Sequence, residues 1–120
     1  MPKYVDGFLL PVPKKNLKAY KAMAAKAAKI WREYGALDYR ECVGEDLKPS
    51  FGVPFPKQMK CKTGETVVFS WIVYKSKAHR NAVNKKIMKD PRLAEMCDPK
   101  NMPFDMKRMC YGGFQVLVEI

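Results

Sequence analysis

The amino-acid sequence predicts a single α+β domain whose strands and helices follow the order β-α-β-β-α-β. Two observations carry this prediction. Residues 17–34 show the apolar spacing of an amphipathic helix, and residues 65–74, "ETVVFSWIVY", form a strand-like run of large apolar side chains. This order is the ferredoxin-like arrangement, in which two helices cover one face of a four-stranded antiparallel sheet. With 120 residues, 48% of them hydrophobic, the chain can build one core and not two, so residues 1–120 are one domain.

The first strand and the first helix are bounded by proline, asparagine and glycine. Residues 4–12 alternate and are rich in β-forming residues, and Pro11 and Pro13 end them. We expect Asn16 to cap the following helix and Gly35 to stop it. The apolar stripe of this alanine-rich helix consists of Leu17, Tyr20, Ala24, Ala27 and Trp31. Both propensity and capping therefore indicate a helix here.

The second half of the chain predicts two more strands and a shorter helix after a strand at 37–43. A proline-rich loop, "KPSFGVPFPKQ", precedes the strand at 65–74, and its Phe51 and Phe55 are candidates to cover a pocket. Ser76 is the expected cap of a helix over "SKAHRNAVNKKIMKD", which Pro91 ends or offsets. A helical turn at 93–96 and a last strand at 107–120 complete the chain.

The strand at 65–74 indicates how the domain assembles. A strand with one wet face alternates, whereas this one is apolar throughout except for Ser70, which is typical of burial on both faces. The two helices cover only one face of the sheet, and an exposed apolar face of that size marks an interaction site. We therefore expect a homodimer joined through the sheet face.

Several short motifs together resemble one known family. They are "YVDGF" at 4–8, "YGAL" at 34–37, "EC" at 41–42, "ETVVFSWIVY" at 65–74, "DPR" at 90–92, "MPFD" at 102–105 and "KRMCYGGF" at 107–114. In these, the chain resembles the YbaA-like family of small bacterial proteins, a domain of unknown function in the dimeric α+β barrel superfamily. The resemblance implies the fold, the dimer and a binding cleft between sheet and helices. It implies no activity, because no catalytic motif of the superfamily's monooxygenases, peroxidases, haem-degrading enzymes or isomerases matches positions here.

The formal charge of +11 makes this a basic protein. Such a charge favours acidic partners in general. However, the charge comes mostly from lysines that are spread over the whole chain, and arginine, which supplies bidentate contacts to phosphate and guanine, is scarce. A solvated basic surface is therefore the preferred interpretation, and nucleic-acid binding is the weaker one.

Cysteine and histidine usage does not indicate a metal site. Cys42, Cys61, Cys97 and Cys110 are far apart, with no C-x-x-C pair and no histidine at ligand spacing, so we expect reduced thiols, no metal and no cofactor. Nucleotide-loop, serine-hydrolase and zinc-protease motifs do not occur. The first fifteen residues match neither a secretory signal nor a membrane span, so a cytoplasmic protein without membrane contact is expected.

Candidate catalytic residues are polar groups in apolar segments. His79 is the only histidine and falls on the apolar stripe of the second helix, where it is either a general base or a core histidine with one hydrogen bond. Asp6, Glu41 and Ser70 interrupt apolar strands, and buried polar groups of this kind need partners. If two of them face the cleft, they form an acid–base cluster with His79; ion pairs at strand ends or at the dimer seam are the alternative.

Candidate ligand-binding residues come from the last two strands and the second helix. Besides Ser70, they are Trp71, Tyr111 and Arg80, which suit a flat or an anionic ligand; the arginine is equally suited to neutralise Asp6 or Glu41. Gly112 and Gly113 are unusual inside a strand. In the ferredoxin-like order they lie near Gly7, where a ligand or the partner subunit is expected to fill the space.

The sequence thus predicts a cytoplasmic homodimer that binds a small aromatic or anionic molecule between sheet and helices. A cofactor-independent oxygenase- or isomerase-like activity is compatible with this prediction. The alternative is a non-enzymatic interaction protein whose basic surface associates with nucleic acid or another polyanion.

Overall fold

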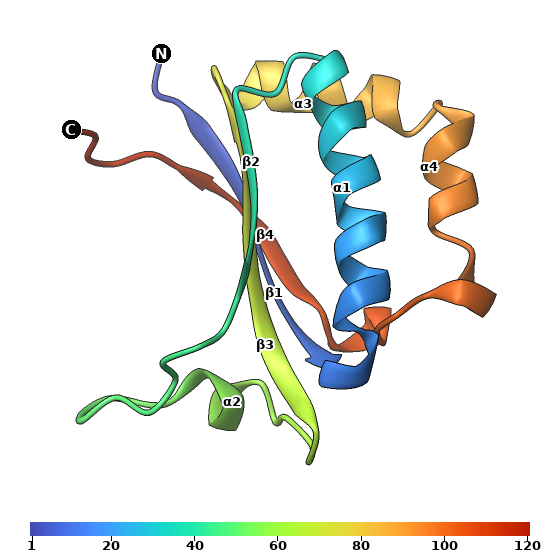
Figure 1. The fold of residues 1–120 in the computed structure, drawn as a ribbon. Coiled ribbons are helices and arrows are strands. Elements are labelled where there is room, and N and C mark those ends of the chain that lie inside the picture. Colours follow the sequence, from blue (N-terminus) through green and yellow to red (C-terminus); the bar gives the residue numbers. More distant parts are fainter.

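A computed structural model describes all residues, 1–120, and consists of one four-stranded sheet with three helices on one face and a short helix on the other (Figure 1). The strands lie in the order β2-β3-β1-β4, and every neighbouring pair is antiparallel. Their bounds are β1 Tyr4–Pro13, β2 Asp38–Val43, β3 Glu65–Tyr74 and β4 Cys110–Gln115. The helices are α1 Leu17–Glu33, α2 Phe55–Gln58, α3 Lys77–Ile87 and α4 Pro91–Met96. The predicted ferredoxin-like arrangement is confirmed.

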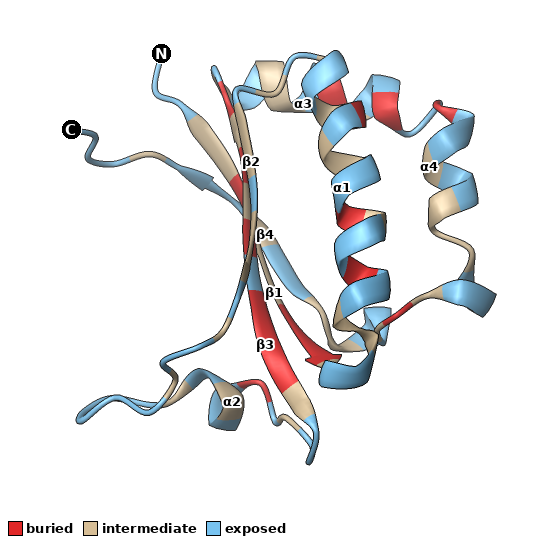
Figure 2. Ribbon diagram, in the orientation of Figure 1, coloured by how far each residue is buried: buried red, intermediate tan, exposed pale blue.

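The molecule has only two layers. Its principal extents are 38 × 38 × 20 Å, and its radius of gyration of 15.1 Å exceeds the value of about 14 Å expected for a compact domain of this length. Only 18 of 120 residues are buried, and the two core clusters that hold most of the apolar ones lie between the sheet and the helices α1 and α3 (Figure 2). The single chain is therefore flatter than a compact domain of this length.

The helix termini show which capping predictions were correct. The Ser76 hydroxyl accepts a hydrogen bond from the His79 backbone N–H at 3.1 Å, as expected of a cap. Gly35 ends α1 with a φ of +108°, a backbone conformation that favours glycine. Asn16 occupies the cap position of α1, but its side chain caps nothing; it donates instead to the Pro103 carbonyl at 3.0 Å, tying the helix start to the 97–109 segment.

The last strand is much shorter than the predicted 107–120. Residues 106–108 form a 3₁₀ turn that Asp105 caps by accepting the Lys107 backbone N–H at 3.0 Å. At the other end, β1 begins at Tyr4, so the chain beyond Gln115 has almost no neighbouring backbone to pair with. It is tied to Lys3 alone, by the bond from Val116 N–H to the Lys3 carbonyl and by the ion pair of Glu119 with the Lys3 ammonium group. The apolar C-terminal residues consequently leave the sheet.

The two adjacent glycines of β4 lie where the sequence predicts. Gly112 pairs with Gly7, and Gly113 pairs with Asp6. The chain itself fills the space at Gly113, whereas Gly7 and Gly112 line a groove on the open face of the sheet, where a ligand or a partner subunit stays a prediction. The Tyr4 ring occupies the place where a Cβ of Gly113 would lie, and the Phe114 ring covers Gly7.

β3 has one covered and one open face. Ser70, Ile72 and Tyr74 point toward the helices and are buried, whereas Phe69 on the opposite face is 47% exposed and Trp71 is half-buried. Part of the loop between β2 and β3 covers the far end of that face, where Val67 is buried beneath Leu47 and Phe55. The two-sided burial predicted for this strand is thus only half achieved within one chain.

None of the helices combines the length and the apolar character that a membrane crossing requires.

The close fit at Gly113 generates a stability prediction. Gly113→Ala forces the Tyr4 ring, on which the Arg80 guanidinium stacks at 4.8 Å, out of its place. We expect a loss of about 1–3 kcal/mol in the free energy of unfolding, as for other overpacked sites. Gly112→Ala is the matched control, since its Cβ would lie an ordinary 3.9 Å from the Phe114 ring. Equal unfolding midpoints for both variants in urea would contradict this account.

Candidate functional site

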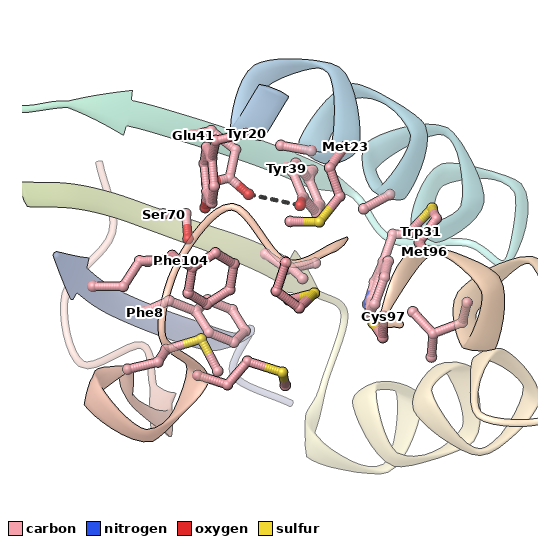
Figure 3. A pocket seen from close by; sticks show the side chains of 18 residues that line it. Phe8, Tyr20, Met23, Trp31, Tyr39, Glu41, Ser70, Met96, Cys97 and Phe104 are labelled. Carbon is pink, nitrogen blue, oxygen red and sulfur yellow. Dashed lines mark hydrogen bonds between the residues drawn. The ribbon is translucent and has the colours of Figure 1, made fainter. Parts of the chain in front are cut away.

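The candidate site is a cavity of about 200 Å³ between the sheet and α1 (Figure 3). Side chains from β1, β2 and β3 form one wall, α1 forms the second, and α4 with residues 97–109 closes the third. It is lined by Phe8, Leu10, Tyr20, Met23, Ala24, Ala27, Trp31, Tyr39, Glu41, Ser70, Ile72, Leu93, Met96, Cys97, Met102, Phe104, Met106 and Met109. Sixteen of the 18 are hydrophobic, and the two others are Glu41 and Ser70.

Regular spacing within the elements directs these side chains inward. Alternate residues of a strand share a face, so Tyr39 and Glu41 of β2 point the same way, as do Ser70 and Ile72 of β3. On α1 the lining residues recur every three or four positions, which places them on one face. Six of the lining side chains, Met96, Cys97, Met102, Phe104, Met106 and Met109, come from the segment that runs from α4 toward β4.

The polar centre of the cavity is a carboxylate held by two phenols. The Tyr20 hydroxyl donates to Glu41 Oε1 at 2.6 Å, and the Tyr39 hydroxyl donates to Oε2 at 2.7 Å (Figure 3). Burial, followed by the Glu41 charge, raises the pKa of both tyrosines well above the ordinary value. Both phenols therefore stay protonated as donors to the carboxylate, and Glu41 is fixed at the wall by one hydrogen bond on each oxygen.

Ser70 lies beside this carboxylate. It is the cross-strand partner of Glu41 in the β2–β3 register, and it is only 3% exposed. Side chains directly opposite each other on antiparallel strands have Cβ atoms about 4.5–5.5 Å apart. The Ser70 hydroxyl takes no part in the two phenol–carboxylate hydrogen bonds, so the cavity offers a carboxylate and a neighbouring hydroxyl on one wall.

A second polar cluster surrounds Asp6, outside the cavity lining. Arg80 Nη1 donates to Asp6 Oδ1 at 3.2 Å, and Asn84 Nδ2 donates to Oδ2 at 3.5 Å. Arg80 also stacks on the Tyr4 ring and donates to its hydroxyl at 3.4 Å. This cluster closes the space between β1 and α3, and its charges are paired within the chain.

One hydrogen-bond chain connects the cluster with the cavity. Trp31, a lining residue, donates its indole N–H to the Tyr74 hydroxyl at 3.1 Å, and Tyr74 in turn donates to Asn84 Oδ1 at 3.4 Å. Burial, with a further contribution from the Asp6 charge, raises the pKa of Tyr74, which keeps this hydroxyl a donor. The indole that lines the cavity is thereby held in one orientation.

The segment covering the cavity is tied down by an ion pair. Arg108 donates from Nη1 to Glu65 Oε2 at 2.6 Å and from Nη2 to Oε1 at 2.8 Å, and its Nη2 also reaches the Lys60 carbonyl at 3.0 Å. The Asn16 bond to Pro103 holds the middle of the segment. The bidentate pair, together with the Lys62 backbone N–H, lowers the pKa of Glu65 to about 2.

The structure brings together only some of the residues that the sequence singled out. Glu41 and Ser70 line the cavity side by side. Asp6 instead pairs with Arg80, which is the ion-pair alternative, and the Arg80 guanidinium is not a lining group. Trp71 and Gly112 lie along a groove on the open face of the sheet; Tyr111 also borders this groove and stacks on Phe8, which lines the cavity as well. Gly113 is covered by Tyr4.

The predicted acid–base cluster around His79 does not form. The His79 Nδ1 accepts the Lys75 backbone N–H at 3.0 Å, and a Cβ at Gly35 would lie 3.3 Å from its Nε2. The ring thus packs where α3 begins and α1 ends and does not line the cavity, because Ser76 caps α3 and His79 falls in its first turn. Phe51 and Phe55 also cover no part of the cavity, since their loop lies on the other side of the sheet.

Tyr20, Tyr39 and the methionines of 96–109 are the site residues that sequence reasoning missed. Tyr39 and Glu41 stand two apart in one strand, so their common face was readable from the sequence. The pairing of Tyr20 with Glu41 was not readable, because it joins two elements whose relative rotation depends on packing. No three His, Cys, Asp or Glu side chains come together to hold a metal ion.

This architecture defines an α+β protein of ferredoxin-like fold with a cavity between sheet and helices. Two solved structures share the fold. A dimeric ferredoxin-like protein from an uncultured marine organism matches with a TM-score of 0.62 and 13% identity, over 100% of both chains. An uncharacterized NIPSNAP domain protein from Burkholderia xenovorans matches with a TM-score of 0.54 and 14% identity, over 92% of this chain and 91% of the other. Such low identity shows the fold alone.

Sequence comparison gives the family. Residues 3–106 match the family model described as protein of unknown function (DUF1428). The chain is 47% identical over 117 residues to the uncharacterized protein YbaA of Escherichia coli K12, with 98% of each chain covered, and equally to YbaA of Shigella flexneri. The chain therefore belongs to this YbaA-like family, as its motifs indicated.

The pair of Glu65 with Arg108 generates a prediction about acid stability. Arg108 and the Lys62 backbone N–H lower the pKa of Glu65 from 4.5 to about 2 in the folded chain. The ion pair therefore stabilises the folded protein above pH 4.5, and this contribution is lost as the pH falls toward 2. Glu65→Gln should therefore be less stable than wild type at neutral pH, with the difference shrinking toward pH 2. Urea unfolding across this range measures it, with Glu45→Gln as control. A difference that does not change with pH would contradict the assignment.

Proposed function

We propose that the protein is a homodimer that binds a small, neutral, aromatic or similarly apolar molecule in the cavity of each subunit. Glu41 is the group that orients this ligand, by accepting a hydrogen bond from it. The observation that carries the proposal is the carboxylate itself, held by Tyr20 and Tyr39 at the wall of an otherwise apolar cavity. Ligand sites in proteins have this composition, an apolar lining with a few fixed polar groups.

The size of the cavity supports a small ligand. An apolar cavity of roughly 150 Å³ accommodates benzene, so a cavity of about 200 Å³ suits a compound of one or two fused rings. The methionines on its covering side are unbranched and polarisable, and such side chains adapt to ligands of irregular shape. A carboxylate on an apolar wall costs free energy unless its hydrogen bonds are made, and Tyr20 and Tyr39 supply only some of those that Glu41 can accept.

The negative charge of Glu41 in the lining favours neutral ligands over anionic ones. Glu41 is the only charged side chain among the 18 lining residues, and a ligand carboxylate would be repelled by it at short range. Arg80, which the sequence offered as an anion-binding group, is engaged with Asp6. The anionic ligand class is therefore not part of this proposal.

The open sheet face supports the homodimer. A shallow apolar groove on this face is lined by Val5, Leu9, Phe69, Trp71 and Phe114, among others. Phe69 and Phe114 are 47% and 62% exposed in the single chain, an arrangement that normally marks an interface. The marine ferredoxin-like protein of the same fold is described as dimeric. A second copy seated on this face would complete the burial of β3 that its sequence predicts.

The alternative function, a polyanion-binding basic surface, lacks a comparable site. Exposed lysines such as Lys18, Lys57, Lys85 and Lys107 lie on different elements around the molecule. Nucleic-acid binding through them would weaken steeply with added salt, whereas binding of a neutral ligand in the cavity would not. A short DNA duplex, measured at low and moderate salt, therefore distinguishes the two functions.

Three probes of equal ring size test the ligand class. We expect 2-naphthol to bind saturably in calorimetry, naphthalene to bind at least tenfold more weakly because it donates no hydrogen bond, and 2-naphthoate not to bind because Glu41 repels it. Glu41→Gln should reduce the preference for 2-naphthol over naphthalene. Equal affinity for naphthol and naphthoate would contradict the role of Glu41.

A cavity-filling variant tests the location. Ala27→Leu adds three carbons inside the cavity and should weaken 2-naphthol binding at least tenfold while the melting temperature stays equal or rises. Ala25→Leu places the same side chain on the exposed side of α1 and should leave binding unchanged. Binding that survives Ala27→Leu undiminished would place the ligand elsewhere.

A charge on the open face tests the dimer. Phe69→Glu should yield a folded monomer, because Phe69 is already half exposed in the single chain but would be desolvated against a second copy. Phe51→Glu, at a phenylalanine that is 85% exposed in the β2–β3 loop, is the matched control. Sedimentation equilibrium measures the mass. A monomeric wild-type protein, or a Phe69→Glu variant with unchanged dimer affinity, would overturn this part of the proposal.

A further inference from the structure

We infer that Glu41 is a general base for proton transfer at a carbon atom next to a carbonyl group, and that the cavity acts on small apolar ketones by enolisation. This inference rests on the proposed function, because it assigns a reaction to the same cavity. Three features of the wall carry it: a carboxylate that faces an apolar space, two phenols that fix the carboxylate, and a hydroxyl beside it on the next strand.

The carboxylate is placed as a base requires. Each Glu41 oxygen accepts one phenol hydrogen bond, at 2.6 and 2.7 Å, and a carboxylate oxygen can accept more than one. The remaining lone pairs face a cavity in which Ser70 is the only other lining residue that is not hydrophobic. A carboxylate in such surroundings, oriented by fixed donors, is the arrangement that proton-transfer enzymes use.

The two tyrosines act as positioning residues. Because burial and the Glu41 charge raise the pKa of Tyr20 and Tyr39, neither phenol competes with Glu41 for a proton of the substrate. When Glu41 takes up a proton, it becomes a weaker acceptor, and the phenols then lose part of their interaction. This loss favours release of the proton from Glu41, to water or to carbon.

Ser70 is the donor available to the substrate oxygen. It lies opposite Glu41 across the β2–β3 ladder, faces the same cavity and takes no part in the phenol–carboxylate bonds. A ketone whose α-carbon approaches Glu41 can therefore direct its carbonyl oxygen toward this hydroxyl. Fixed donors aimed at an oxygen that becomes negative are the largest source of stabilisation in such reactions.

The step is balanced without a co-reactant. Glu41 removes a proton from the α-carbon, the electron pair of that C–H bond forms a C=C bond, and the carbonyl pair moves onto oxygen, which accepts a hydrogen bond from Ser70. Glu41, now a carboxylic acid, either exchanges this proton with water and then protonates the same carbon, or passes it to a conjugated carbon. The net result is exchange of the proton or movement of a double bond, with no change in oxidation state.

The probe is 2-tetralone in deuterium oxide. Its enol has the ring system and the hydroxyl of 2-naphthol, so 2-naphthol is an analogue of the enolised intermediate and should bind at least tenfold more tightly than the ketone. Proton NMR reports both the loss of the α-proton signals and, through line broadening, binding of the ketone itself. We expect the wild-type protein to accelerate the exchange well above the buffer rate.

Variants of Glu41 and Ser70 separate the role of the base from that of the hydrogen-bond donor. Glu41→Gln should bring the exchange rate down to that of buffer while the ketone still binds, and Ser70→Ala should lower it about 100-fold. Glu45→Gln, which replaces an exposed loop carboxylate, should exchange at the wild-type rate. If Glu41→Gln fails to fold, Tyr39→Phe serves as the second variant, since it keeps the base but frees one of its oxygens and should slow exchange without preventing binding.

The possible results bear separately on the ligand site, on the reaction and on Glu41 as the base. Saturable binding of 2-tetralone and 2-naphthol without accelerated exchange overturns the reaction and leaves the proposed ligand site standing. Absence of binding by both compounds overturns the site and the reaction together. Exchange that persists in Glu41→Gln shows that another group is the base and overturns the assignment made here.

Discussion

The structure depends on one constraint: β3 carries large apolar side chains on both faces, while the chain has helices for only one. Antiparallel pairing with β1 and β2 puts β3 at the centre of the sheet. Its helix-facing side chains are buried by α1 and α3, which accounts for most of a small core. The other face, with Phe69 and Trp71, stays partly exposed in the single chain. The flat, two-layered shape of the single chain follows from this imbalance.

The cavity is a consequence of how the covered face is packed. α1 is rich in alanine, so its inner face is too small to fill the space over the central strands, and the gap is closed from the side by α4 and by residues 97–109. A covering segment without long helices or strands has little stability of its own. It is held by specific bonds, the bidentate pair of Arg108 with Glu65 and the bond from Asn16 to Pro103.

Polar groups on the covered face divide into two sets with different surroundings. Asp6 lies among Arg80 and Asn84, so its charge is neutralised and the cluster acts as a structural clamp between β1 and α3. Glu41 has no cation among its hydrogen-bond partners and is held only by phenols. The two carboxylates look alike in the sequence, since each interrupts an apolar strand, yet only Glu41 faces a space that a ligand can enter. The hydrogen-bond chain through Trp31 and Tyr74 links the clamp to the cavity wall.

The sequence by itself determined the two main helices, the four strands and their order, because apolar periodicity and local caps such as Ser76 act over a few neighbouring residues. Its short motifs indicated the family by resemblance. It also placed Gly112 and Gly113 near Gly7, since antiparallel order follows from topology. Only the tertiary structure decided that His79 lies outside the cavity, that Tyr4 fills the space at Gly113, and that Tyr20 meets Glu41. Those contacts join elements far apart in the chain. Their geometry is set by how α1 rotates and settles on the sheet, which depends on the packing of all side chains at once.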